Sequence, residues 1–211
     1  MIIISHRGYW KSAAEKNTPA AFARSFQLGF GAETDLRDFA GRLVISHDPP
    51  GLDALPADAL FEIHVAANGK LPLALDIKSD GLQPFVKEIL EHFQPADHFV
   101  FDMSIPDALG YLAAGIPVFT RHSEFERQPA FYEKAAGVWM DGFETDWMRE
   151  VDIHGHLKAG KRVCIVSPEL HGRNHLEIWQ RLAAMPCASD PRLMLCTDFP
   201  EEARDLFRGS A

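Results

Sequence analysis

The 211-residue chain is 46% hydrophobic and 24% charged, a balance typical of a globular protein with a large core and not of a disordered or collagenous one. Its formal net charge of −9 at pH 7 disfavours broad attraction to a nucleic-acid backbone or to an anionic membrane surface. We therefore expect no nucleic-acid partner and no stable membrane association.

The start of the chain and its cysteines indicate the compartment. The opening Met-Ile-Ile-Ile-Ser lacks the basic region of a signal peptide, and no stretch reaches the roughly 18 apolar residues that a membrane span needs. Cys164, Cys187 and Cys196 are too few and too far apart for a disulfide framework. These features predict a reducing, cytoplasmic location.

Short apolar runs rich in β-branched residues alternate with amphipathic segments along the chain. The predicted strands are residues 1–5, 32–37, 71–78, 98–102, 116–120, 138–141, 162–166 and 193–197. The predicted helices include residues 18–28, 82–93, 107–114, 146–158 and 174–185. Eight such units with short loops predict an α/β protein that forms one domain over residues 1–211, a (β/α)8 TIM barrel. An open, doubly wound sheet is the competing topology.

One connection departs from the alternation. The extended run Arg42–Ser46 follows the second strand with no room for a helix, which predicts a β-hairpin turning near Ala40-Gly41. The base of this hairpin would bring His47 roughly opposite Asp35. If the hairpin stands on the barrel rim, it returns His47 to the mouth.

Two segments end alike, each in a histidine. They read Ile-Ile-Ile-Ser-His6-Arg7-Gly8 and Leu-Val-Ile-Ser-His47-Asp48-Pro49. Barrel enzymes place their catalytic groups at the carboxyl ends of the strands, so His6 and His47 are candidate catalytic residues. The other close pair, His154 and His156, lies in a predicted exposed helix, and we interpret it as surface.

Three acidic residues are predicted to share the same mouth. Glu33 and Asp35 lie two residues apart on a strand and project from one face, and Asp76 with Lys78 repeats this spacing on the next barrel strand. Crowded carboxylates raise one another's pKa unless a cation lies among them. Oxygen-only ligands favour one hard divalent ion, Mg²⁺ or Ca²⁺. The structural alternative is an ion pair between Glu33 and Lys78.

A metal flanked by Arg7 and Lys78, with two histidines nearby, suits a phosphodiester. The cations would balance charge on the phosphoryl oxygens, while one histidine deprotonates the nucleophile and the other protonates the leaving alkoxide. Acyl transfer fits less well because the chain has no Gly-x-Ser-x-Gly elbow. Arg121 and Arg173 follow later strands, where they either bind the anionic substrate or pair with nearby acids: Glu124, Glu126 or Glu169.

Taken in order, these and other motifs resemble the glycerophosphodiester phosphodiesterase family, a branch of the barrel phosphodiesterases. The matching pieces are His6-Arg7-Gly8, Asn17-Thr18 with Ala21-Phe22, Glu33-x-Asp35, His47-Asp48, Ile77-Lys78 after an acid, and Thr197-Asp198-Phe199-Pro200. The resemblance implies a (β/α)8 barrel with His6 and His47 as the acid–base pair. It also implies a divalent metal on Glu33, Asp35 and Asp76, and phosphate contacts from Arg7 and Lys78.

The chain departs from the family pattern at four places. Lys16 occupies a position where the family usually has Glu. Asp76 occupies the position of the third metal ligand, where the family usually has the longer Glu. The family insertion after the His-Asp pair is reduced to residues 49–70. The loop after the seventh strand, residues 166–173, carries polar and charged groups where the family commonly has an aromatic wall, which puts glycerol itself in doubt as the alcohol.

The leading hypothesis is a metal-dependent phosphodiesterase that hydrolyses a small soluble phosphodiester, a glycerophosphodiester or a related glycerol or sugar phosphodiester, to a phosphomonoester and an alcohol. The alternative is a non-catalytic barrel that binds a phosphorylated ligand. A pure binding module has no reason to keep both His6 and His47, so their presence favours an enzyme. The oligomeric state is left open.

Overall fold

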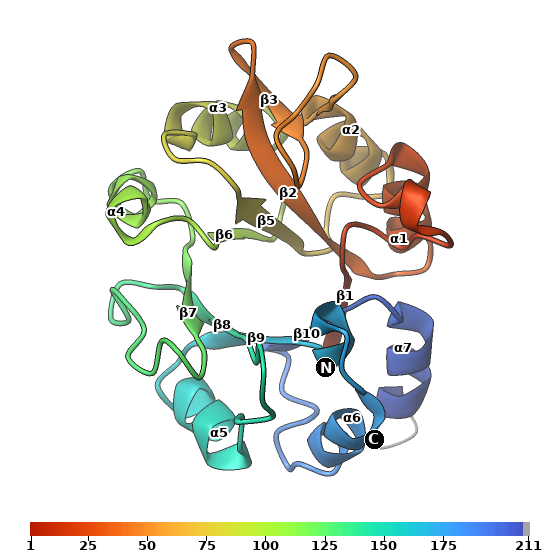
Figure 1. The fold of residues 1–211 in the computed structure, drawn as a ribbon, viewed down its shortest axis with the longest axis vertical. Helices are drawn as coiled ribbons and strands as arrows, with labels where there is room; N and C mark the ends of the chain where they lie inside the picture. Colours follow the sequence, from red (N-terminus) through yellow and green to blue (C-terminus); the bar gives the residue numbers. More distant parts are fainter. Residues whose placement is uncertain (209–211) are drawn as a thin grey trace. The chain divides into compact units, whose positions relative to one another are not determined.

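The computed structural model describes residues 1–208, which form two compact units (Figure 1). The N-terminal unit comprises residues 5–118, and the C-terminal unit comprises residues 1–4 together with the chain from Phe119 onward. Each unit has its own parallel strands. The interpretation of residues 1–211 as one domain stays a prediction.

The N-terminal unit is built on a sheet with the strand order β4-β3-β2-β5-β6. Its strands are β2 (Gly31–Phe39), β3 (Arg42–Ile45), β4 (Leu55–Pro56), β5 (Leu73–Ile77) and β6 (His98–Phe101). Its helices are α1 (Pro19–Gln27), α2 (Asp58–Ala66), α3 (Gln83–Phe93) and α4 (Ile105–Ala113), with a short 3₁₀ turn at Ala13–Glu15. Strands β2, β5 and β6 run parallel, whereas β3 and β4 are antiparallel additions.

The predicted hairpin joins β2 to β3, and Figure 1 shows β2 continuing from the sheet into it. The turn residues Ala40 and Gly41 have φ values of 49° and 77°, as a two-residue hairpin turn with two positive φ angles requires. At the base, the backbone N–H of Ser46 donates to the carbonyl of Asp35 over 3.0 Å. Ser46 thus pairs with Asp35, and His47 follows it directly at the base of the hairpin.

The core of the N-terminal unit lies between these strands and the helices that pack on them. Helix α1 packs on α2, and α2 on α3. Phe22 of α1, Phe61 of α2, Leu75 of β5 and Val86 of α3 are fully buried there. Helix α2 is not among the predicted helices, because its sequence Asp-Ala-Leu-Phe-Glu-Ile-His-Val-Ala is apolar around most of its circumference and lacks a clear polar face.

The C-terminal unit has the strand order β1-β10-β9-β8-β7. Its elements are β1 (Ile2–Ser5), β7 (Phe119–His122), β8 (Gly137–Met140), α5 (Glu150–Lys158), β9 (Arg162–Val166), a 3₁₀ helix at Pro168–His171, α6 (Leu176–Ala183), β10 (Leu193–Thr197) and α7 (Pro200–Arg208). Strands β7 to β10 pair in parallel, α5 packs on β9, and α6 packs on α7.

All eight predicted barrel strands are present, so the alternating α/β class is confirmed; closure into a barrel stays a prediction. The fifth strand differs most, because β7 begins at Phe119 and the preceding Val118 makes only an isolated bridge to Val100. Helix α7 was not predicted. Within residues 1–208, none of the helices combines the length and apolar character that crossing a bilayer requires.

Candidate active site

The first strand ends in a tight turn that sets the backbone of His6 and Arg7. Arg7 and Gly8 both have positive φ, 55° and 76°. A Cβ on Gly8 would lie 2.9 Å from the backbone of Ala21 at the start of α1, so only glycine fits there. The Ser5 hydroxyl donates to the Gly31 carbonyl over 2.9 Å, which fixes this turn against the start of β2.

The three predicted acids come together in the N-terminal unit. Glu33 and Asp35 project from one face of β2, and Asp76 is the direct partner of Asp35 on the neighbouring strand β5. All three are buried, with at most 6% of the residue exposed. One carboxylate oxygen from each lies within 4.8 Å of the others.

Arg7 and Asn17 orient two of these carboxylates. The backbone N–H of Arg7 donates to Glu33 Oε2 over 2.9 Å, and the Nε2 of His6 lies 3.9 Å from the same oxygen. The Asn17 amide donates to Asp35 Oδ2 over 2.8 Å. The Arg7 guanidinium forms an ion pair with that oxygen, at 3.1 Å from Nε. The motif residues after the first strand thus hold the acids of the second.

Lys78 lies among the remaining carboxylate oxygens. Its Nζ is 2.6 Å from Asp76 Oδ2, 3.6 Å from Asp35 Oδ1 and 3.7 Å from Asp102 Oδ2. The alternative pairing of Lys78 with Glu33 is therefore wrong, because the ammonium is taken by the other acids. Asp102 follows β6 directly, and an Asp at such a strand end either contacts a substrate or caps the next helix; here its carboxylate lies beside the Lys78 ammonium.

The charges in this cluster change the ionisation of its members. Burial, reinforced by the negative charges of Asp35 and Asp76, raises the pKa of Glu33 well above its ordinary value. Burial and then the Asp102 carboxylate raise the pKa of Asp76 to about 8, although Lys78 opposes this. The two cationic side chains, Arg7 and Lys78, do not fully compensate the negative charge of the buried carboxylates. A further cation would therefore be stabilised among them.

The donor set fits a hard divalent cation. Its atoms are carboxylate oxygens only, which suits Mg²⁺ or Ca²⁺. Asp76 Oδ1 is buried and has no hydrogen-bond partner among residues 1–208. A buried carboxylate oxygen without a partner is costly, and an ion at this position would satisfy it.

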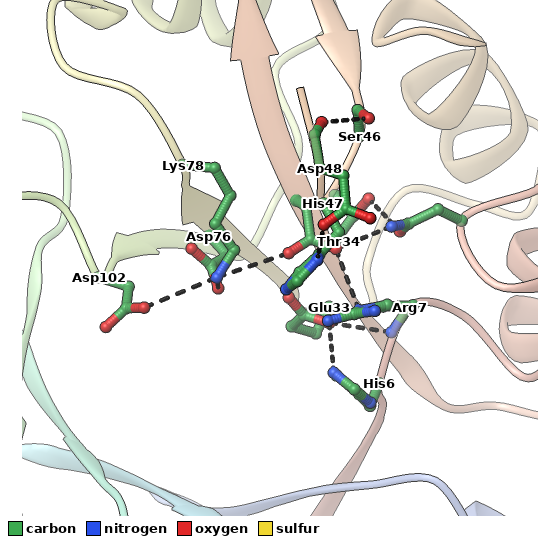
Figure 2. Close-up of polar contacts among 12 residues, drawn as sticks. His6, Arg7, Glu33, Thr34, Ser46, His47, Asp48, Asp76, Lys78 and Asp102 are labelled. Atoms are coloured by element: carbon green, nitrogen blue, oxygen red, sulfur yellow. Dashed lines mark hydrogen bonds and ion pairs between the residues drawn. The ribbon is translucent and has the colours of Figure 1, made fainter. Parts of the chain in front are cut away.

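His47 lies on the other side of a groove from α1. Its side chain is 44% exposed, and its Nδ1 lies 2.8 Å from Asp48 Oδ1. His47, Arg7 and Lys16 line this groove, which has a volume of about 560 Å³. Figure 2 shows side chains from separate strands and from the turns that follow them converging on the site: His6, Arg7, Glu33, His47, Asp76 and Lys78.

Arg121 and Arg173 are in the C-terminal unit and form ion pairs there. Arg121 pairs with Glu126, one of the two outcomes considered for it. Arg173 pairs with Asp146 and donates to the carbonyl of Gly142; its partner is thus not Glu169, which accepts from the backbone N–H of Asp198 over 3.1 Å. Both arginines brace loops of their own unit.

The interpretation of the His154 and His156 pair as surface is correct for His154 and wrong for His156. His156 is buried, with its Nε2 2.9 Å from His122 Nδ1 and its Nδ1 2.8 Å from the Tyr132 hydroxyl. Burial, then the neighbouring His122, lowers the pKa of His156 to about 4. His156 lies on the buried face of α5 with Ile153 and Leu157, and its polar partners come from other segments of the chain.

A scan against protein-family models and a search of curated proteins give no match. Solved structures, however, show that glycerophosphodiester phosphodiesterases have this fold, in agreement with the family resemblance of the sequence motifs. The crystal structure of such an enzyme from Agrobacterium tumefaciens superposes with a TM-score of 0.70 at 20% identity, covering 100% of this chain and 98% of that one. A glycerophosphoryl diester phosphodiesterase from Parabacteroides distasonis gives 0.66 at 14% identity, covering 99% and 86%.

A third solved structure shows why the fold alone does not define the chemistry. The phosphoribosyl anthranilate isomerase of Thermus thermophilus matches with a TM-score of 0.52 at 15% identity over 99% of this chain and 97% of that one. An isomerase therefore shares the architecture. The assignment of a reaction depends on the residues of the site.

Proposed function

We propose that the chain is a metal-dependent phosphodiesterase of the glycerophosphodiester phosphodiesterase family. Its substrate would be a small soluble glycerophosphodiester, or a related glycerol or sugar phosphodiester, cleaved to a phosphomonoester and an alcohol. The observation that carries the proposal is the buried triad Glu33, Asp35 and Asp76, flanked by the two cations Arg7 and Lys78.

Glu33, Asp35 and Asp76 would hold one divalent ion, Mg²⁺ or Ca²⁺. When bound, such an ion supplies Lewis-acid polarisation of a phosphoryl oxygen. The neighbouring side chains of Arg7 and Lys78 would balance the remaining negative charge of the phosphoryl oxygens. Asn17 keeps Asp35 oriented through its 2.8 Å hydrogen bond.

His47 and His6 would carry the proton transfers. With His47 Nδ1–H donating to Asp48 Oδ1, Nε2 would be the basic nitrogen that takes a proton from the attacking water. The water oxygen bonds to phosphorus, the bond from phosphorus to the alcohol oxygen breaks, and His6 donates a proton to the departing alkoxide. Each turnover ends with the two histidines in exchanged protonation states, which solvent restores.

Arg121 and Arg173 are proposed to act on substrate binding through the loops that they hold, and not on the reacting phosphorus. Their ion pairs with Glu126 and Asp146 fix the loops after β7 and β8. In the proposed enzyme these loops contact the part of the substrate away from the phosphorus. Their arginines would then affect substrate choice and not the rate of bond cleavage.

A panel of phosphodiesters assayed with Mg²⁺, Ca²⁺ and Mn²⁺, and again with EDTA, tests the proposal. We expect release of a phosphomonoester from at least one glycerol or sugar phosphodiester, abolished by EDTA and restored by metal. Tight binding of a phosphorylated ligand without turnover of any diester would favour the alternative, a non-catalytic binding barrel.

A further inference from the structure

Asp102 is an acidic residue beside the site for which the proposed reaction has no role. It follows β6 directly, with a φ of 67°, in the left-handed region that Asp and Asn tolerate better than most residues. Its side chain is 24% exposed, and its Oδ2 lies 3.7 Å from Lys78 Nζ. In Figure 2 Asp102 lies on the side of Lys78 away from Glu33 and His6.

The ammonium of Lys78 and a bound divalent ion would compete for the same oxygens. Lys78 Nζ lies 2.6 Å from Asp76 Oδ2 and 3.6 Å from Asp35 Oδ1, and both residues belong to the triad that would hold the ion. Two cations in contact with the same carboxylates repel each other. Entry of the ion therefore requires the ammonium to move away from Asp76.

Asp102 offers the ammonium another position. Its Oδ2 is almost as close to Nζ as Asp35 Oδ1 is, at 3.7 Å against 3.6 Å, and Asp102 is outside the triad. A flexible lysine stem allows a small shift of the ammonium. Moving from Asp76 toward Asp102 keeps Lys78 paired and leaves the Asp76 oxygens to the ion.

We propose that Lys78 is a placeholder cation in the metal-free site and that Asp102 is the positioning residue that draws its ammonium aside when a divalent ion binds. The inference rests on the proposed function, since it takes Glu33, Asp35 and Asp76 as the ion's ligands. Asp102 acts through Lys78 and does not itself ligate the ion. Its effect on metal affinity should therefore require the lysine.

A double-mutant cycle followed by calorimetric titration with Mg²⁺, without substrate, tests the inference. The proteins are the wild type, Asp102→Asn, Lys78→Gln and the double variant. Asn keeps the tolerance for a left-handed backbone while removing the charge. We expect Asp102→Asn to weaken Mg²⁺ binding by about tenfold when Lys78 is present, within the range for coupled neighbours, and by less than about twofold in the Lys78→Gln protein.

Other results overturn the inference. An equal loss of affinity in both backgrounds would mean that Asp102 acts on the ion directly, and unchanged affinity in both would mean that it positions nothing. If Asp102→Asn does not fold, Asp102→Gly replaces it, because glycine adopts this φ without strain.

Failure of the proposed function can be distinguished from failure of this inference. A wild type that binds Mg²⁺ but hydrolyses no diester contradicts the activity and leaves the cycle fully interpretable. A wild type that binds no Mg²⁺ overturns the placeholder role, whatever its activity.

Discussion

Asp35 and Asp76 are direct partners at one register position of the adjacent parallel strands β2 and β5. Both are buried, and side chains at paired positions of neighbouring strands lie on the same face of the sheet. Like charges so placed repel each other, and Glu33 adds a third carboxylate from the same face of β2. The Lys78 ammonium and the Arg7 guanidinium compensate this repulsion in part, which leaves a position where a divalent ion is favoured.

Removing one charge from the triad should strongly weaken metal binding without disturbing the turn at Arg7. In Glu33→Gln, the amide oxygen can still accept from the backbone N–H of Arg7, as Glu33 Oε2 does over 2.9 Å. We expect Mg²⁺ affinity to fall at least ~10²-fold, since even outer-sphere partners of a metal are worth about 10–100-fold. Calorimetric titration measures the change.

The matched control is Glu91→Gln, which neutralises a carboxylate that is 69% exposed and paired with Lys87. Its Mg²⁺ affinity should equal that of the wild type. Unchanged binding in Glu33→Gln would remove Glu33 from the ligand set.

His6 and His47 should behave as one unit in turnover. Activity should follow a bell-shaped pH profile, because one imidazole must be neutral and the other protonated. His6→Ala or His47→Ala should each lose roughly 10² to 10⁴ in rate on an unactivated diester. The double variant should lose much less than the product of the single losses.

The exposed His154, changed to Ala, is the matched control and should keep full activity. Near-full turnover in either single variant, with metal binding intact, would end the acid–base assignment for that residue. A steady-state assay at several pH values gives all of these quantities.

Metal should stabilise the protein more at alkaline than at mildly acidic pH. The pKa of Asp76 is raised from 3.8 to about 8 in the metal-free protein, so the folded state holds a proton that the unfolded state has lost between these values. Stability from this group is therefore lost as pH rises through that window. A divalent ion favours the ionised carboxylate and opposes the loss.

Thermal unfolding with and without Mg²⁺ checks this. The increase in Tm on adding Mg²⁺ should be several degrees larger near pH 8.5 than near pH 6, because each kcal/mol of added stability raises the Tm of a protein of this size by about 2–4 °C. The metal-free Asp76→Asn protein should have a flatter Tm profile between these pH values. A wild-type Tm increase that is independent of pH would contradict the altered ionisation of Asp76.

The loop after β9 should affect substrate choice more than bond cleavage. Arg173, in this loop, pairs with Asp146 and donates to the Gly142 carbonyl in the loop after β8, so Arg173→Ala should free the two loops from each other. We expect a higher KM on the natural diester and nearly unchanged hydrolysis of a small activated diester. Equal losses on both would show that Arg173 belongs to the catalytic machinery.

The sequence predicted most of the local arrangement of the site. Period-two spacing put Glu33 and Asp35 on one face, and the turn residues Ala40-Gly41 predicted the hairpin that brings Ser46, the residue before His47, back to Asp35. These features depend on neighbours in the chain, which pattern reasoning can follow.

The sequence predicted that Glu33, Asp35 and Asp76 share one mouth, but not the exact pairing of residues between strands. The register that pairs Asp35 with Asp76 and the backbone turn that aims Asp102 at Lys78 depend on tertiary packing. His156 was misassigned for the same reason, because its partners His122 and Tyr132 come from other segments. Helix α2 was missed because its residues are apolar around most of the helix, so they show no alternation between a buried and an exposed face.

The most direct test of the central claim is ³¹P NMR of a glycerophosphodiester incubated with the protein, in Mg²⁺ and then in EDTA, beside Glu33→Gln. A metal-dependent phosphodiesterase converts the diester resonance to that of a phosphomonoester in Mg²⁺, stops in EDTA and resumes when metal is restored, while Glu33→Gln leaves the diester intact. Persistence of the diester resonance with every glycerol and sugar phosphodiester tested, in a folded protein that binds Mg²⁺, would contradict it.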